Sequence, residues 1–224
     1  MHTSQDGITA IIPAKGVSSR LPNKNILDFH GNPLVVHKIK QLKQVHEVDC
    51  IIVSSDDDHI LELALKEGVQ AVKRPVRYTL DDVSIAEFFE YIPSIVRTTH
   101  TAWTCCTSPT FDERRIRTAI ALYRENVPDK NDSLISVMEY KHFLFDSNGP
   151  LNFGIGREHK YSQDLPRYDL FTNGILIAPT ARYAEWGSNF GPNPFRFEVD
   201  QITAIDIDTP VDFEVAKRLW EIRK

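Results

Sequence analysis

Ile8-Thr9-Ala10-Ile11-Ile12-Pro13 is a short apolar run that leads directly into the polar segment Ala14-Lys15-Gly16-Val17-Ser18-Ser19-Arg20-Leu21-Pro22-Asn23-Lys24-Asn25. The run predicts a buried strand, and the segment after it predicts a loop. Cations and hydroxyls crowd this loop: Lys15, Arg20, Lys24, Ser18 and Ser19. Fixed positive charge and the amide groups of small residues are what phosphate oxygens bind. The stretch therefore predicts a triphosphate site, with a solvated basic loop as the alternative.

Short apolar runs and helical patterns alternate along the rest of the chain. Further strands are predicted at 49–54, 70–73, 102–106, 133–138, 171–178, 195–199 and 204–208. Helices are predicted at 33–45, 57–67, 83–97, 112–126 and 210–223, the last with Val211, Val215, Leu219 and Ile222 on its apolar face. This alternation indicates an α/β fold, a mostly parallel sheet with helices on both faces. Its ligands are expected beyond the carboxyl ends of the strands.

Residues 140–167 interrupt that rhythm. They are aromatic and rich in Gly and Pro, and they predict short β segments outside the main sheet, an inserted excursion within the range 139–170. The length of 224 residues otherwise predicts a single domain over residues 1–224.

Composition excludes several classes of function. The net charge of −5 argues against a nucleic-acid partner. No apolar run approaches the length of a membrane-spanning helix, and residues 1–7 lack a secretory pattern. Cys50, Cys105 and Cys106 form neither a disulfide framework nor a metal-ligand pattern. Cys105 and Cys106, placed on a predicted strand, should face opposite sides. We expect a cytoplasmic protein with reduced, mostly buried thiols.

Two carboxylates follow near the carboxyl end, in Ile205-Asp206-Ile207-Asp208-Thr209-Pro210. On a strand, Asp206 and Asp208 would share a face, with Cβ atoms roughly 7 Å apart. Their mutual repulsion favours a bound Mg²⁺, which accepts one or two carboxylates together with phosphate oxygens. The alternatives are that Asp208 caps the following helix or that both side chains face water.

Two weaker signals lie between these segments. Thr107-Ser108-Pro109 is a turn at the carboxyl edge of the predicted sheet. Arg74-Pro75 is followed by Ser84 at a helix start, where Asp81 or Asp82 could simply be the N-cap.

Taken together, these segments resemble the acylneuraminate cytidylyltransferase family, the CMP-sialic acid synthetases and their bacterial relatives. The family opening reads roughly I-I-P-A-R-G-G-S-K-R-I-P-x-K-N, which residues 11–25 follow. Further matches occur in order: Val53-Ser54-Ser55-Asp56-Asp57, Arg74-Pro75, Ser84, Thr107-Ser108-Pro109, Gln163-Asp164-Leu165-Pro166, Thr172-Asn173-Gly174 and Asp206-Ile207-Asp208-Thr209-Pro210-Val211-Asp212-Phe213. The likeness spans nearly the whole chain.

The resemblance implies a Rossmann-like nucleotidyltransferase that joins CTP to a small acidic sugar, with loss of pyrophosphate, and works as a homodimer. It implies that the excursion contributes to the dimer and to the partner's sugar pocket. Lys15, Lys24, Asp206 and Asp208 would form the catalytic group, the two aspartates as Mg²⁺ ligands. The nucleotide would contact Ala14, Lys15, Gly16, Ser18, Arg20, Lys24, Asn25, Arg74, Ser84 and Thr107. The sugar would contact Gln163, Asn173 and Arg167.

The chain departs from the family pattern mainly on the sugar side. Lys15 replaces an Arg, which keeps the charge but loses the planar fork; Val17 replaces a Gly, and Ser19 replaces a Lys. Cys105-Cys106 stands where the family has Gln-Pro, a Gln that typically reaches the sugar. Ser162 stands where an Arg often pairs with the sugar carboxylate. These changes predict an unusual acceptor, with Arg157 or Arg167 supplying the carboxylate contact.

Two other functions are compatible with parts of the pattern. A metal-dependent glycosyltransferase that uses a nucleotide sugar also carries Asp-x-Asp, although it should lack the cationic loop. A catalytically inactive nucleotide-binding relative would explain the altered sugar side, although Lys24 and both aspartates are present. No histidine is expected to act as a base, since the histidines are scattered along the chain.

Overall fold

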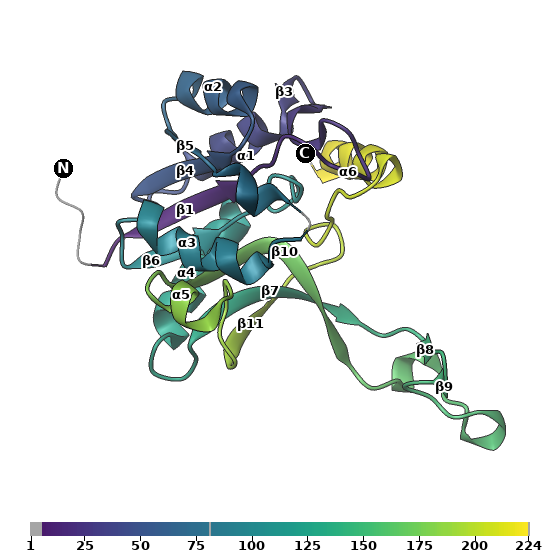
Figure 1. The fold of residues 1–224 in the computed structure, drawn as a ribbon. Coiled ribbons are helices and arrows are strands. Elements are labelled where there is room, and N and C mark those ends of the chain that lie inside the picture. The colour runs from purple at the N-terminus through teal and green to yellow at the C-terminus, as the bar shows by residue number, and fades with distance from the viewer. Residues whose placement is uncertain (1–5, 81, 224) are drawn as a thin grey trace.

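A computed structural model describes residues 6–80 and 82–223. Its core is a sheet in the order β11 (Pro194–Glu198), β7 (Ser133–Tyr140), β10 (Tyr168–Pro179), β6 (His100–Trp103), β1 (Ile8–Pro13), β4 (Cys50–Ser55) and β5 (Gln70–Lys73). Strand β10 runs antiparallel to both β6 and β7, and the other neighbouring pairs are parallel. The predicted α/β fold with a mostly parallel sheet is confirmed (Figure 1).

Helices cover both faces of this sheet because the strands are apolar on both faces. Along β1, Ile8, Ala10 and Ile12 belong to one buried cluster and Ile11 to another. The first cluster packs against α1 (Leu34–Leu42), α2 (Asp58–Lys66), α4 (Glu113–Asn126) and α6 (Pro210–Arg223). The second packs against α3 (Ile85–Ile95) and α5 (Arg182–Trp186).

Two predicted strands need correction. Strand β6 ends at Trp103 rather than Cys106, because the chain turns there and the Ser108 amide donates to the Cys105 carbonyl. Cys105 and Cys106 therefore lie in a turn, and the expectation that they face opposite sides of a strand is wrong. Residues 204–208 form no strand either.

The buried face of α6 also differs from the prediction. Val211 is 70% exposed and Ile222 is 69% exposed, whereas Ala216 is fully buried. The contact is made by the aromatic side chains of Phe213 and Trp220, whose rings pack against Phe29. Aromatic rings bury more area than aliphatic side chains, so they determine which face of the helix meets the core.

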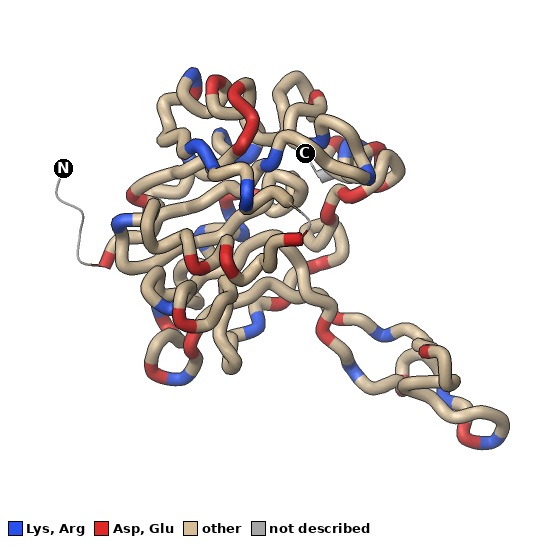
Figure 2. Tube along the Cα trace, viewed as in Figure 1, with Lys and Arg blue, Asp and Glu red and all other residues tan. Residues whose placement is uncertain are grey.

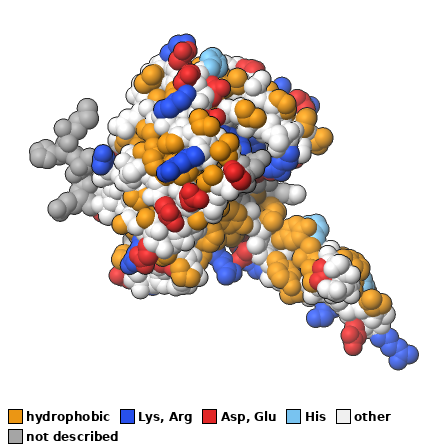
Figure 3. Space-filling model, viewed as in Figure 1, with side chains coloured by type: hydrophobic (Ala, Val, Ile, Leu, Met, Phe, Trp, Pro, Cys, Tyr) orange, Lys and Arg blue, Asp and Glu red, His pale blue; other side chains and the backbone are white. Residues whose placement is uncertain are grey.

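Residues 141–167 form an arm that projects from the sheet where β7 ends and β10 begins (Figure 1). The arm contains β8 (Phe145–Asp146), β9 (Gly149–Pro150), η3 (Gly156–Glu158) and η4 (Ser162–Asp164). Hydrophobic side chains lie on its surface in Figure 3, and the large exposed ones are Phe143, Phe145, Leu151, Ile155 and Tyr161.

The remaining short elements are η1 (Lys24–Ile26), β2 (Asp28–Phe29), β3 (Asn32–Pro33) and η2 (Val76–Thr79). Acidic and basic residues are interspersed along the trace in Figure 2. Within the described part of the chain, none of the helices combines the length and the apolar character needed to cross a bilayer.

Candidate active site

The loop after β1 is held against β4 by its own backbone. The Ala14 amide donates to the Ser54 carbonyl at 3.0 Å, and the Gly16 amide donates to Asp56 Oδ1 at 2.9 Å. A Cβ atom on Gly16 would lie 2.8 Å from the Cβ of Asp57, so only glycine allows this close approach. Both amides are therefore engaged within the protein. The contact of Ala14 and Gly16 with the nucleotide stays a prediction, and the cationic side chains of the loop are the other groups that phosphate oxygens can bind.

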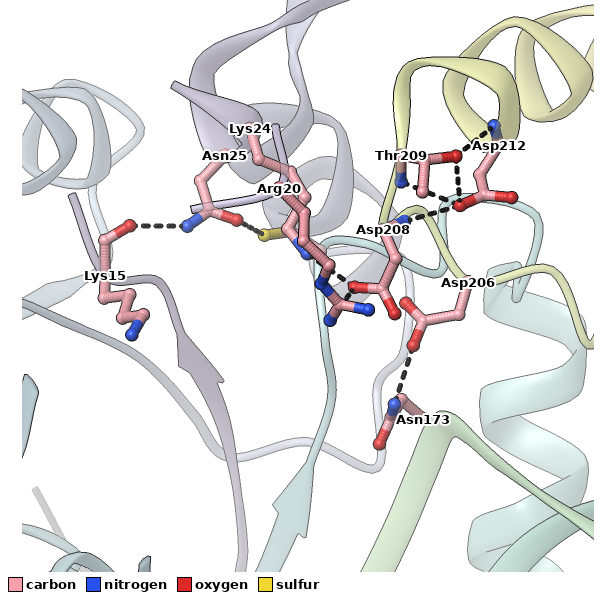
Figure 4. Close-up of polar contacts among 10 residues, drawn as sticks. Lys15, Arg20, Lys24, Asn25, Asn173, Asp206, Asp208, Thr209 and Asp212 are labelled. Carbon is pink, nitrogen blue, oxygen red and sulfur yellow. Dashed lines mark hydrogen bonds and ion pairs between the residues drawn. The ribbon is translucent and has the colours of Figure 1, made fainter. Parts of the chain in front are cut away.

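Two cations of this loop contact Asp208, although nearly the whole length of the sequence separates the loop from that carboxylate. The Arg20 guanidinium donates to Asp208 Oδ1 at 2.8 Å, and Lys24 Nζ donates to the same oxygen at 3.0 Å (Figure 4). Asn23, in the left-handed conformation that Asn tolerates, starts the turn of η1 that carries Lys24. The two sequence signals thus form one cluster.

Asp206 and Asp208 lie on an extended segment without a strand partner. The Ile207 amide, between the two aspartates, donates to the Thr107 carbonyl at 2.8 Å. Ile207 is fully buried, so the predicted alternation survives although the strand does not. Thr107, predicted to contact the nucleotide, contributes its carbonyl to this support.

The helix cap after Asp208 is made by other residues. The Asp212 carboxylate accepts from the Thr209 amide at 2.7 Å, and Thr209 Oγ1 accepts from the Asp212 amide at 3.3 Å, which is a reciprocal cap. The Asp208 amide also donates to Asp212, at 3.1 Å. Burial acts to raise the pKa of Asp212, but the hydrogen bonds from Thr209 and Asp208 outweigh it and lower that pKa. The backbone of Asp208 is thus held by the helix cap, and the Asp208 side chain is not the capping group.

Asp206 is oriented by an irregularity in β10. The β10–β7 register shifts between Phe171 and Leu176, and in that bulge Asn173 donates to Asp206 Oδ2 at 2.7 Å. Asp206 Oδ1 is buried and has no hydrogen-bond partner among the described residues. A carboxylate with one oxygen held and the other unsatisfied can accept a cation or a donor from a ligand.

The bulge has its own support, which the sequence did not reveal. The buried Ser136 hydroxyl on β7 accepts from the Thr172 hydroxyl at 2.7 Å and from the Ile175 amide at 3.1 Å. At Gly174 a Cβ atom would lie 2.1 Å from the Phe111 ring, so the ring packs directly on the glycine backbone. Only the pairing of β7 with β10 brings Ser136 to this position, and no motif indicated it.

A cavity of about 340 Å³ opens beside the loop. Lys15, Arg74 and Ser84 line it, as do Phe88 and Trp103. Three residues predicted to contact the nucleotide thus come from separate segments to one cavity. A second cavity of about 260 Å³ also includes Lys15, together with Ser19 and Asp56.

Arg74 is the buried cation of the larger cavity. Its guanidinium donates to the Ser54 carbonyl at 2.8 Å and lies 4.1 Å from the centre of the Phe88 ring. Burial lowers the pKa of Arg74 to about 10, so the side chain stays charged at neutral pH. Ser84 caps α3 by accepting from the Ala86 amide at 3.2 Å. Asp82 is therefore not the cap, and Asp81 lies outside the described residues.

Asn25 has an internal role in this structure. Its side-chain amide donates to the Lys15 carbonyl at 2.8 Å and accepts from the Cys106 thiol at 3.1 Å (Figure 4). Asn25 therefore ties the loop to the β6 turn, and it is not among the residues that line either cavity. Ser18 is half-buried in the same loop.

The three cysteines are free, and only Cys106 is fully buried. Burial raises the pKa of the Cys105 and Cys106 thiols to about 12, so neither ionises at neutral pH. Asp206 adds to the increase at both positions, which places its charge within electrostatic range of the β6 turn.

The sugar-side residues are not brought together within one chain. Gln163 in η4 and Arg157 in η3 lie on the arm, away from Asn173 (Figure 1). Arg167 is paired with Asp169 at 3.1 Å and with Glu198 at 2.7 Å. Its charge is compensated, so Arg157 is the better candidate for a carboxylate contact.

Residues 9–222 match the protein-family model described as cytidylyltransferase. The chain belongs to the cytidylyltransferase family. It is therefore an enzyme that uses CTP to transfer a nucleotidyl group, as the sequence predicts.

Relatives of this cytidylyltransferase act on sugar acids according to their names. The pseudaminic acid cytidylyltransferase of Campylobacter jejuni subsp. jejuni serotype O:23/36 (strain 81-176) is 28% identical over 224 residues, covering 95% of each chain. The CMP-N,N'-diacetyllegionaminic acid synthase of Legionella pneumophila subsp. pneumophila (strain Philadelphia 1) is 28% identical, covering 97% of each chain. A solved structure of CMP:2-keto-3-deoxy-manno-octonic acid synthetase complexed with CTP has a TM-score of 0.74 at 18% identity. It covers 98% of this chain and 100% of that one, and the likeness shows a shared fold.

Proposed function

We propose that this cytidylyltransferase activates a nonulosonic acid, a sialic-acid-like sugar, by joining it to CMP from CTP with release of pyrophosphate. The observation that carries this proposal is the meeting of Arg20 and Lys24 with Asp208 at 2.8 and 3.0 Å. Asn25, next to Lys24, bonds the carbonyl of Lys15, which lines the cavity that contains Arg74. The names of the relatives supply the sugar class.

An observation that does not depend on the relatives supports Mg²⁺ binding by the carboxylate pair. Asp206 Oδ1 is a buried carboxylate oxygen without a donor, and such an atom is costly unless a ligand satisfies it. The described residues contain no cluster of three or more His, Cys, Asp or Glu suited to a metal. The other ligands would thus be phosphate oxygens and water, as Mg²⁺ prefers. Held by Asp206 and Asp208, Mg²⁺ would withdraw charge from the phosphate oxygens that it binds.

The chain's own residues account for the rest of the reaction. The nucleoside would occupy the cavity beside Arg74 and Ser84, with Lys15 at its phosphate end. Arg20 and Lys24 would turn from Asp208 to the triphosphate and offset the charge that develops on the departing pyrophosphate. The anomeric hydroxyl of the sugar would attack the α-phosphorus in line with that leaving group. Asn173, which donates to Asp206, would keep that carboxylate oriented when the acceptor binds.

The acceptor side is proposed to be shared between two copies in a homodimer. The arm projects from the sheet and carries exposed hydrophobic side chains, which supports this proposal, and Gln163 and Arg157 would then serve the partner's site. We place the enzyme in the cytoplasm, where CTP is available, and in the synthesis of a cell-surface polysaccharide.

Pyrophosphate release from CTP and Mg²⁺, measured with a panel of nonulosonic acids, tests the proposal. We expect one acid to give pyrophosphate and the CMP-sugar in equal amounts, and neutral hexoses to give neither. CTP binding without pyrophosphate release from any acid would indicate an inactive relative. Hydrolysis of a nucleotide sugar in place of pyrophosphate release would indicate a glycosyltransferase.

A further inference from the structure

A fully buried lysine lies behind the site and takes no part in the proposed chemistry. Lys38, on α1, has no exposed surface, and its ammonium donates to the carbonyls of Ser108 at 3.0 Å and Phe111 at 2.8 Å. One turn further along the helix, Gln41 donates to the Pro109 carbonyl at 2.8 Å. Helix α1 thus holds three carbonyls of one turn, residues 107–111, which we call the anchored turn.

The anchored turn contacts the segment that carries both carboxylates and the β10 bulge that orients one of them. At its start, the Thr107 carbonyl receives the Ile207 amide, between Asp206 and Asp208. At its end, the Phe111 ring packs on Gly174, next to the Asn173 that orients Asp206. A shift of this turn would therefore move both carboxylates, although Lys38 touches neither.

The position requires a side chain that donates hydrogen bonds to carbonyls, which lysine can do and an apolar side chain cannot. An ammonium has three donors and no acceptor, so it can satisfy two inward-facing carbonyls at once. Burying an ammonium is unfavourable, and burial lowers the pKa of Lys38 to about 8. A methionine of similar length would avoid that penalty. It would leave the Phe111 carbonyl without its lysine donor and the Ser108 carbonyl with the Phe111 amide alone, at 3.2 Å.

We propose that Lys38 is a positioning residue for nucleotidyl transfer, which holds Asp206 and Asp208 in place through the anchored turn. The inference rests on the proposed function of the two aspartates. Its effect should fall on the transfer step rather than on CTP binding, because Arg74, the buried cation of the cavity, is held by Ser54 on β4.

The test compares Lys38→Met with Lys40→Met. Lys40 lies on the same helix, is exposed, and donates to the Asn32 side chain. With the best acid of the panel, we expect Lys38→Met to lower kcat roughly tenfold or more and to leave KM for CTP within about twofold. Lys40→Met should change neither. Wild-type kcat in a folded Lys38→Met protein would overturn the proposal.

Amide hydrogen exchange supplies a readout that needs no turnover. In Lys38→Met the Ile207 amide should exchange faster than in the wild type, while the amides of β1 and β4 keep their protection. Unchanged Ile207 exchange, or faster exchange throughout the sheet, would overturn the positioning role. If no acid is turned over by the wild type, the proposed function fails and this measurement still decides the role of Lys38.

A milder variant covers the case in which Lys38→Met does not fold. Gln41→Leu removes one of the two side-chain partners of the Pro109 carbonyl and leaves His37 Nε2 at 3.2 Å, so it should show faster Ile207 exchange and a smaller fall in kcat at unchanged KM for CTP. Wild-type exchange and wild-type kcat in that variant would contradict the proposal.

Discussion

The two halves of the site are built in different ways. On the nucleotide side, contacts within one chain fix every segment: the loop to β4, Asn25 to the β6 turn, and Asp208 to Arg20 and Lys24. On the acceptor side, Asn173 is fixed, but Gln163 and Arg157 lie on an arm that leaves the body (Figure 1). The nucleotide half is preorganised within the chain, whereas the proposed acceptor half would be completed by the partner chain of the proposed homodimer.

Among the departures from the family pattern, Ser162 lies on the arm, and the others lie in the loop after β1 and in the β6 turn. Groups that bind CTP must meet each other and the internal supports of the loop, so a change at one position disturbs several contacts. Residues on the arm have few such constraints, and substitutions there can alter the acceptor without affecting CTP. Substitutions in the nucleotide half should therefore change KM for CTP, and substitutions on the arm should change KM for the acid.

The largest effect is expected from Asp208→Asn. Loss of the metal ligand should lower kcat by about 10²-fold or more, at an unchanged unfolding temperature. Without metal the same variant should bind CTP more tightly than the wild type, because Arg20 and Lys24 are no longer neutralised by a carboxylate. Calorimetric titration of CTP into metal-free protein measures this. Weaker metal-free binding by the variant would show that these cations do not face the triphosphate.

Arg74→Met should affect the nucleotide half alone. We expect KM for CTP to rise roughly 10- to 100-fold, because a buried charged donor of the cavity is lost. Arg77→Met is the matched control, since Arg77 lies over the Tyr78 ring and does not line the cavity. Steady-state kinetics at saturating acid distinguishes the two. Equal effects of both substitutions on KM for CTP would show that the nucleoside does not bind in this cavity.

Arg157→Ala should affect the acceptor half alone. KM for the acid should rise roughly tenfold while KM for CTP stays constant, if Arg157 meets the sugar carboxylate. Arg167→Ala should raise KM for the acid less, because Asp169 and Glu198 already neutralise that side chain. The opposite ranking would assign the contact to Arg167.

The smallest effect concerns the cap that orients Asp208. Asp212→Ala should cost about 1 kcal/mol at pH 7, the usual cost of losing a helix cap. The pKa of Asp212 is lowered in the folded state, so its stabilisation is complete above the ordinary value of 3.8 and is lost as the pH falls through the folded value. Thermal unfolding of both proteins from pH 7 to pH 3 should therefore show converging stabilities. A constant difference down to pH 3 would contradict this account of the cap.

Short-range patterns in the sequence were sufficient for most of the fold. The helix at 210–223 and the strand at 70–73 match α6 and β5 because caps and apolar runs mark them locally. Residues 204–208 alternate like a strand, but tertiary contact leaves them with one backbone bond to Thr107 in place of a ladder. The buried face of α6 depends on Phe29, a residue far away in the sequence.

The sequence predicts the charged residues of the candidate site but not the residues that hold them in place. Lys24 and Asp208 were recognised by type and motif, and the fold brings them together as expected. The supports were not predictable, because Ser136, Lys38 and Asp56 act on backbone groups that only the folded chain brings near. Buried side chains that bond to distant carbonyls leave no spacing pattern in the sequence.

Crystals grown with CTP and Mn²⁺ in place of Mg²⁺ test the central claim most directly, since anomalous scattering locates the metal. The account predicts a Mn²⁺ peak bound by Asp206 and Asp208, with the triphosphate against Lys24 and Arg20 and the base in the cavity beside Arg74. A metal bound elsewhere, with Asp208 still paired to both cations while CTP is present, would contradict it.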